Sequence, residues 1–131
     1  MAKARLIEAD RDYVAIGHQY ALDVVSGKIL ACGWVVKACQ RQIDDLARDD
    51  FEYRFDHEKA SRICIFAEMM PHIKGRWKSK NIFLEPWQCF QLTVIFGWVH
   101  KVTGFRRFRK ALIVIPRKNS KSTMAAIVGL Y

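Results

Sequence analysis

Acidic residues are missing from the last third of this 131-residue sequence: no Asp or Glu follows Glu85. The formal net charge of the whole chain is +9. The stretch after Glu85 carries the basic residues Lys101, Arg106, Arg107, Arg109, Lys110, Arg117, Lys118 and Lys121. This distribution favours a polyanionic partner such as a nucleic acid or a nucleotide. The alternative is a solvated basic surface with no special partner.

Long apolar runs and paired cysteines are also absent. No run reaches the roughly 18 to 20 residues of a membrane span, and no signal-peptide core follows the N-terminus, so we expect a cytosolic protein without membrane contact. The four cysteines, Cys32, Cys39, Cys64 and Cys89, form no CxxC pair. Their apolar neighbours predict buried, reduced thiols. A zinc site that uses them with His18, His57, His72 or His100 is the less favoured alternative.

Apolar residues make up 51% of the sequence, which predicts a folded chain. Their spacing in the first hundred residues is helical. The first predicted helix runs from Asp10 to Val25 and stops at Ser26-Gly27, and the second runs from Ile29 to Leu46. The third begins at a cap, Asp56, runs through Met70 and is closed by Pro71 and Gly75. The fourth runs from Glu85-Pro86 through Val99. The last of these helices is apolar on most sides and is therefore expected to be well buried.

The pattern changes after a predicted turn at Thr103-Gly104. The unbroken apolar run Ala111–Ile115 predicts a parallel strand that is buried on both faces. Residues 116–120 then form a loop, and Ser122–Leu130 resumes helical spacing. The order of helices, strand, loop and helix is typical of the opening of a nucleotide-binding α/β domain.

The segment 115–123, with the sequence IPRKNSKST, lies where a phosphate-binding loop belongs. Lys121 can reach terminal phosphates, and the Ser122 hydroxyl can bind Mg²⁺. The pattern G-x-x-x-x-G-K-[ST] is not matched strictly, because its two glycine positions fall on Ile115 and Ser120. The alternative is a basic loop followed by an ordinary helix.

Several motifs together resemble the large terminase subunits of tailed phages. They are Leu84-Glu85-Pro86-Trp87-Gln88, Phe96-Gly97-Trp98, Gly104-Phe105-Arg106-Arg107-Phe108 and Pro116-Arg117-Lys118-Asn119-Ser120-Lys121-Ser122. In that family the loop characteristically departs from the strict glycine pattern in this way. Upstream, the resemblance includes Val25–Ile29, Ala38–Arg41 with Asp45-Leu46, Phe66–Glu68 and Lys74-Gly75, so it covers nearly the whole chain.

The resemblance implies ATP and Mg²⁺ as cofactors. Lys121 would hold the β- and γ-phosphates, Ser122 would ligate Mg²⁺ through the nucleotide, and Arg117 would sense or stabilise the γ-phosphate, so Lys121 and Arg117 are the catalytic candidates. The same loop would contribute Lys118, Asn119, Ser120 and Thr123 to nucleotide binding. Contact of Arg117 or Lys118 with DNA or solvent is the alternative, and for Arg117 the phosphate role is favoured. Gln88 would recognise adenine through its amide. Trp87 would stack on the base or, as the favoured alternative, pack in the core.

The fold expected from this resemblance is mostly α in the N-terminal part, leading into the first strand–P-loop–helix of an incomplete α/β P-loop NTPase domain. Residues 1–83 would be a helical region, and residues 84–131 the truncated start of the ATPase domain. The implied role is ATP binding for viral DNA packaging in the bacterial host cytoplasm. The implied partners are double-stranded phage DNA, the portal protein, the small terminase subunit and further copies in a homo-oligomeric ring.

Hydrolysis requires a strand that ends in an aspartate for Mg²⁺, together with a carboxylate that activates water. The family carries both downstream of the loop, and its nuclease is C-terminal. We therefore expect this chain alone to be inactive as an ATPase and as a nuclease. A single strand has two open edges, so the last 30 residues or so should also be more sensitive to proteolysis than the part before Gly104.

Two other functions are compatible with the sequence. The chain could be a non-catalytic nucleic-acid-binding module, or a prophage remnant or helical interaction protein with a vestigial loop. Arg106, Arg107 and Arg109 could face DNA or a neighbouring subunit, or they could form a basic sheet edge.

Overall fold

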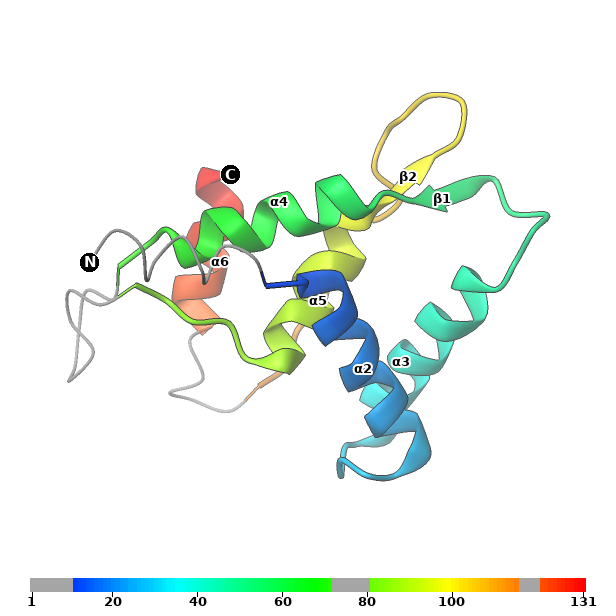
Figure 1. Ribbon diagram of the computed structural model, residues 1–131, viewed down its shortest axis with the longest axis horizontal. Coiled ribbons are helices and arrows are strands. Elements are labelled where there is room, and N and C mark those ends of the chain that lie inside the picture. The colour runs from blue at the N-terminus through cyan, green and yellow to red at the C-terminus, as the bar shows by residue number, and fades with distance from the viewer. Residues whose placement is uncertain (1–10, 72–80, 116–120) are drawn as a thin grey trace.

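The computed structural model describes residues 11–71, 81–115 and 121–131, and within these ranges it contains five helices and two short strands (Figure 1). In chain order the elements are α2 (Tyr13–Ser26), α3 (Gly33–Leu46), β1 (Tyr53–Phe55), α4 (His57–Glu68), α5 (Pro86–Gly97), β2 (Trp98–His100) and α6 (Lys121–Leu130). The described part of the chain is thus mostly helical with a two-stranded sheet, which confirms the mostly helical part of the expected fold, while the P-loop NTPase fold stays a prediction.

Helix α2 begins and ends close to the predicted positions. The Asp12 side chain caps its first turn by accepting a hydrogen bond from the Ala15 N–H at 3.0 Å. Gly27 ends the helix with a φ of 86°, the left-handed conformation that glycine adopts without strain. The predicted stop at Ser26-Gly27 is therefore confirmed.

Helix α3 begins at Gly33 rather than at the predicted Ile29. The Ile29 N–H donates to the Asp23 carbonyl at 3.1 Å, which folds the chain back over the end of α2. Ile29 and Ala31 also pack against the cluster between α2 and α3. The apolar residues in this linker are thus used for tertiary packing before the helix starts, and periodicity alone does not distinguish that use from an additional helical turn.

The cap predicted at Asp56 and the helix start predicted at Glu85-Pro86 are both present. The Asp56 carboxylate accepts the Lys59 N–H at 3.1 Å at the start of α4. Glu85 and Gln88 form a reciprocal capping box at the start of α5, with Pro86 in the first turn. Helix α4 ends at Glu68, two residues before Met70, while Gly75 lies outside the described residues.

Helix α5 does not continue to Val99 as predicted, because residues 98–100 form β2. This strand pairs antiparallel with β1, with Phe55 opposite Trp98 and Tyr53 opposite His100. The change from helix to strand occurs at Gly97, where an added Cβ would lie 2.5 Å from the Phe55 ring. The glycine therefore allows β1 to approach the end of α5 closely enough to pair with β2.

Helix α5 lies at the centre of the fold, between α2 and α4, and α3 packs on α2 (Figure 1). Its residues Cys89, Phe90, Leu92 and Phe96 are buried, which confirms the prediction of a well-buried helix. α2 crosses it at Gly17, where an added Cβ would meet the Phe90 backbone at 3.0 Å. Both α2 and α4 precede residue 83, and the division into 1–83 and 84–131 remains a prediction.

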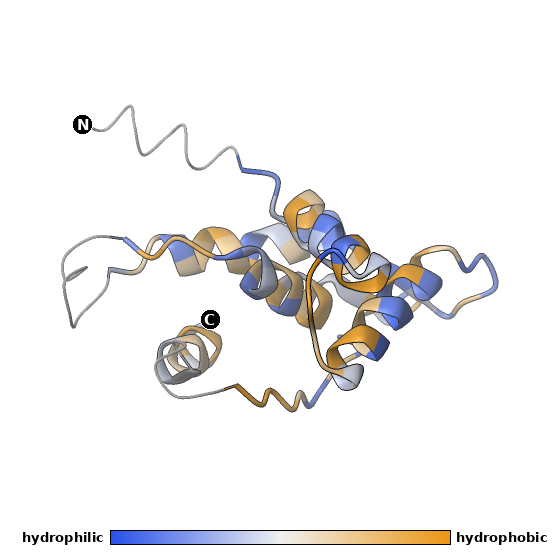
Figure 2. Cartoon of the chain, turned by 90° about the horizontal axis from the view of Figure 1, so that it is seen from below, coloured by the Kyte–Doolittle hydropathy of each residue, from blue (hydrophilic) through white to orange (hydrophobic). Residues whose placement is uncertain are grey.

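The predicted buried strand Ala111–Ile115 is wrong for this structure. The segment has no strand conformation and runs as a hydrophobic stretch of chain toward α6 (Figure 2). Leu112 and Val114 are 91% and 84% exposed. A parallel strand buried on both faces needs neighbouring strands, and within the described ranges the only sheet is the β1–β2 pair, which lies elsewhere. The apolar run therefore has no strand to pair with.

Helix α6 follows this segment and packs on the helical core through Met124 and Ile127. The Tyr131 ring lies 5.4 Å from Phe66 and 5.5 Å from Phe96, measured between ring centroids. After Gly104, the chain is thus anchored to the core through α6 and Tyr131, whereas the apolar run that precedes α6 is exposed. The predicted contrast in proteolysis across Gly104 remains to be measured.

The cysteines are all free thiols, and Cys39, Cys64 and Cys89 are buried as predicted. The prediction is wrong for Cys32, which is exposed at the N-cap of α3. No three His, Cys, Asp or Glu side chains in the described ranges are grouped to hold a metal, and His72 lies outside those ranges. In the same ranges, no helix has the length and apolar character needed to cross a bilayer.

Candidate nucleotide-binding site

The residues predicted to bind nucleotide lie in two described helices and in one segment that the structure does not describe. Arg117, Lys118, Asn119 and Ser120 lie outside the described residues. Residues 121–123 open helix α6, and Trp87 and Gln88 lie in the first turn of α5.

The start of α6 has features that suit a phosphate group and its metal ion. Ser122 and Thr123 are exposed there, and the first turn contains no acidic residue. The N–H groups and the positive end of the dipole at a helix N-terminus favour anions. An exposed hydroxyl in that turn is a suitable Mg²⁺ ligand. The described part of the predicted site therefore fits the chemistry of an Mg²⁺–nucleotide.

Gln88 is buried, with 6% of its surface exposed. Its Oε1 accepts the Glu85 N–H at 2.9 Å, while the Glu85 side chain accepts from the Gln88 backbone. This capping box uses the amide oxygen and leaves the two Nε2 hydrogens as donors. Trp87 beside it is half-buried, so the structure is compatible with both roles considered for this residue.

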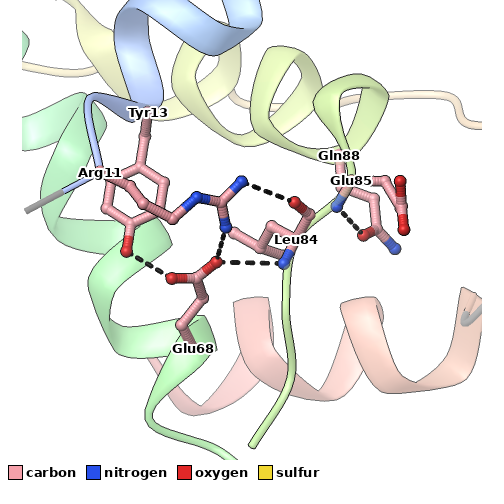
Figure 3. Close-up of polar contacts among 6 residues, drawn as sticks. All are labelled: Arg11, Tyr13, Glu68, Leu84, Glu85 and Gln88. Atoms are coloured by element: carbon pink, nitrogen blue, oxygen red, sulfur yellow. Dashed lines mark hydrogen bonds and ion pairs between the residues drawn. The ribbon is translucent and has the colours of Figure 1, made fainter. Parts of the chain in front are cut away.

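The chain immediately before this turn is held by a polar cluster around Glu68, the last residue of α4 (Figure 3). The Glu68 carboxylate accepts hydrogen bonds from the Arg11 guanidinium, the Tyr13 hydroxyl and the Leu84 N–H, the last at 3.1 Å. Arg11 also donates to the Leu84 carbonyl at 3.1 Å, and its guanidinium lies 3.8 Å from the centre of the Phe83 ring. Sequence reasoning did not single out Glu68 or Arg11, because their partners are distant in the chain.

This cluster shifts the pKa of Tyr13. Burial, the hydrogen bond to Glu68 and the negative charge of Glu68 raise the pKa of the Tyr13 hydroxyl well above its usual 10.0. The raised pKa means that the folded state binds the tyrosine proton more tightly than the unfolded state. The resulting stabilisation is fully present below about pH 10 and is lost as the pH rises through the folded-state value.

We therefore expect Tyr13→Phe to change the pH dependence of stability. At pH 8 the variant should lose about 1.5 kcal/mol, because a hydrogen bond to a carboxylate is removed. Above pH 10 the free energy of unfolding of the wild type should fall more steeply than that of the variant. Urea unfolding at several pH values measures both. Tyr131→Phe, which keeps its ring against Phe66 and Phe96, is the matched control. Parallel pH profiles for wild type and Tyr13→Phe would contradict this assignment.

The three arginines after the Gly104 turn are not equivalent. Arg107 forms an ion pair with the buried Asp45 at 2.8 Å, and its guanidinium lies 4.7 Å from the ring centres of both Phe51 and Phe108. The backbone N–H of Arg107 donates to the Trp98 carbonyl at 3.0 Å. Arg107 thus packs against the fold instead of facing a partner.

Arg106 and Arg109 are exposed, and Arg106 forms an isolated antiparallel bridge with Val99 of β2. Arg106 therefore lies at the edge of the small sheet, as the prediction of a basic sheet edge expected. Contact of Arg106 or Arg109 with DNA or with a neighbouring subunit remains a prediction.

Comparison with known proteins identifies one region of the chain. Residues 86–131 match the family model of the terminase large subunit, ATPase domain. No curated protein and no solved structure matches. The matched region begins at the first residue of α5 and includes Gln88, residues 116–120 and all of α6. The resemblance to terminase large subunits is thereby confirmed for residues 86–131, which are similar to the ATPase domain of that family.

Proposed function

We propose that this chain supplies ATP-binding contacts to a motor that packages viral DNA. The match to the terminase ATPase domain carries the proposal, because one continuous region contains both the Gln88 turn and the basic loop that leads into α6. The exposed Ser122 hydroxyl at the start of α6, with no acidic residue in that turn, supports it further.

In this proposal the loop and the first turn of α6 bind the phosphates. Lys121 holds the β- and γ-phosphates, Arg117 stabilises charge on the γ-phosphate, and Ser122 ligates Mg²⁺. Lys118, Asn119, Ser120 and Thr123 complete the contacts with the phosphates. Bound Mg²⁺ neutralises charge on the phosphate oxygens. Gln88 and Trp87 contribute the contacts with adenine.

Hydrolysis needs carboxylates that residues 86–131 do not contain, since the sequence has no Asp or Glu after Glu85. We infer that ATP hydrolysis and DNA cleavage depend on residues outside this sequence. The partners proposed for the complete motor are double-stranded DNA, a portal protein, a small terminase subunit and further copies of the large subunit in a ring. The proposed setting is the cytoplasm of an infected bacterium.

Replacement of Lys121 by alanine tests this function. We expect the affinity for Mg²⁺–ATP, measured by isothermal titration calorimetry, to fall at least about tenfold. A hydrogen bond from a charged donor contributes about 1.5 to 3 kcal/mol, and each 1.4 kcal/mol is a factor of ten in affinity. Lys37→Ala is the matched control, because it removes the same charge from an exposed position on α3.

The two alternative functions predict different results. For a nucleic-acid-binding module, Lys121→Ala and Lys37→Ala should have equal effects on ATP affinity, while DNA affinity should depend steeply on salt. For a vestigial loop, the wild type itself should bind no Mg²⁺–ATP. Either result would overturn the proposed function.

A further inference from the structure

The residue before the α5 capping box has both of its backbone polar groups held by side chains. The Leu84 N–H donates to Glu68, and the Leu84 carbonyl accepts from Arg11, each at 3.1 Å. The two side chains also pair with each other (Figure 3). Glu68 ends α4 and Arg11 precedes α2, so this one residue is tied to two other elements of the fold.

These two bonds hold a part of the backbone that no regular structure supports. Leu84 is fully buried, and its N–H and carbonyl precede the first turn of α5. Buried backbone groups require hydrogen-bond partners. The side chains of Glu68 and Arg11 are themselves only 11% and 17% exposed, which limits competition from water. The position of Leu84 is therefore set by these side chains together with the packing of its own side chain.

The position of Leu84 is passed on to Gln88 through the capping box. Glu85 is bonded covalently to Leu84, and its N–H donates to Gln88 Oε1 at 2.9 Å. This bond directs the amide oxygen toward the backbone and leaves the Nε2 hydrogens available for an acceptor on a base. A shift of Leu84 would move the Glu85 N–H and release the Gln88 amide to turn.

We propose that Glu68 and Arg11 are positioning residues for base recognition, which hold the Leu84–Gln88 turn so that Gln88 presents its amide donors to adenine. The inference rests on the proposed function, because it requires that Gln88 contacts the base of a bound nucleotide. It adds two residues from outside the matched region 86–131 to the machinery of the site. Neither residue needs to touch the nucleotide.

The test compares a ligand that has a base with one that lacks it. Affinities for Mg²⁺–ATP and for Mg²⁺–tripolyphosphate are measured by calorimetry on the wild type, Glu68→Gln and Gln88→Ala. Glu68→Gln keeps an acceptor oxygen but loses the charge that pairs with Arg11. We expect both variants to bind ATP about tenfold more weakly, with tripolyphosphate affinity unchanged, as for the loss of a partner that orients a binding residue.

Glu58→Gln is the matched control, because Glu58 lies in the first turn of the same helix and pairs with Arg62 at the surface. It should bind both ligands as the wild type does. Thermal unfolding establishes that each variant is folded at the temperature of the titration. If Glu68→Gln is unfolded there, Arg11→Lys takes its place, because lysine keeps the charge but lacks the planar fork that reaches both Glu68 and Leu84.

The possible failures are distinguishable. If Gln88→Ala loses ATP affinity while a folded Glu68 or Arg11 variant keeps it, the positioning role is overturned and the proposed function stands. If the Glu68 variant weakens both ligands equally, its effect is a general one on the fold, and the positioning role is again overturned. If the wild type binds neither ligand, or binds ATP no better than tripolyphosphate with Gln88→Ala unchanged, base recognition by Gln88 fails and the inference fails with it.

Discussion

Glu68→Ala is expected to destabilise the fold by about 4 kcal/mol. The substitution removes the acceptor for Arg11, Tyr13 and the Leu84 N–H at once. Each buried donor left without a partner costs about 1 to 3 kcal/mol, and breaking a buried ion pair costs about 3 to 5 kcal/mol because the remaining charge is uncompensated. The cost of the unsatisfied donors and the cost of the broken ion pair cannot simply be added, because the loss of the Arg11 contact is included in both. Urea unfolding followed by circular dichroism measures the change.

Glu58→Ala provides the comparison on the same helix. Its ion pair with Arg62 is exposed, so the loss should stay below about 1 kcal/mol. A second comparison is Arg11→Met combined with Glu68→Leu. Replacing both partners of a buried pair by apolar residues is often close to neutral, so the double variant should be more stable than Glu68→Ala. A loss in Glu68→Ala no greater than that in Glu58→Ala would show that the cluster does not stabilise the fold.

Arg107→Ala is expected to lower the free energy of unfolding by about 3 kcal/mol, because it removes the closer partner of the buried Asp45 carboxylate, at 2.8 Å, and leaves the Arg48 guanidinium at 3.8 Å. The Arg107 and Asp45 side chains are 17% and 9% exposed. The substitution also removes the guanidinium from beside Phe51, Phe108 and Trp98. Contacts between a cation and an aromatic ring contribute about 0.5 to 2 kcal/mol according to their exposure. Thermal and urea unfolding both measure the loss.

Arg109→Ala is the matched control, since Arg109 is two residues away and exposed. Its effect should stay within about 0.5 kcal/mol. Arg107→Lys should fall between the wild type and Arg107→Ala, because lysine keeps the charge but lacks the planar group that stacks on aromatic rings. Equal stability of Arg107→Ala and Arg109→Ala would refute a structural role for Arg107 and return it to the candidates for contact with DNA.

Helix boundaries were predictable wherever a single local interaction decides them. Asp56 and the Glu85–Gln88 pair cap the helices that follow them, and Gly27 ends α2 in the left-handed conformation. Each of these signals acts over three or four residues, so the sequence contains all the information it requires. The burial of α5 was predictable for a similar reason, because a helix that is apolar on most sides must be covered.

The β1–β2 pair was not predictable in the same way. Residues 98–100 continue the apolar pattern of α5, and they become a strand only because residues 53–55 lie beside them. The run Ala111–Ile115 is the opposite case, since its composition favours a buried strand but the described part of the fold offers it no neighbour. Strand formation depends on a partner that is distant in sequence, and the local pattern does not specify that partner.

The presence of the helices and the cap at Asp56 could be predicted from local sequence signals, and so could the resemblance to terminase large subunits that the match at residues 86–131 confirms. The contacts of Glu68 and Arg11 with Leu84, and the pairing of Arg107 with Asp45, were visible only in the folded structure. The difference arises from the separation of the partners along the chain. Caps and helical periods act between near neighbours, whereas the ion pairs Arg11–Glu68 and Arg107–Asp45 join residues 57 and 62 positions apart, and only the packed fold brings them together.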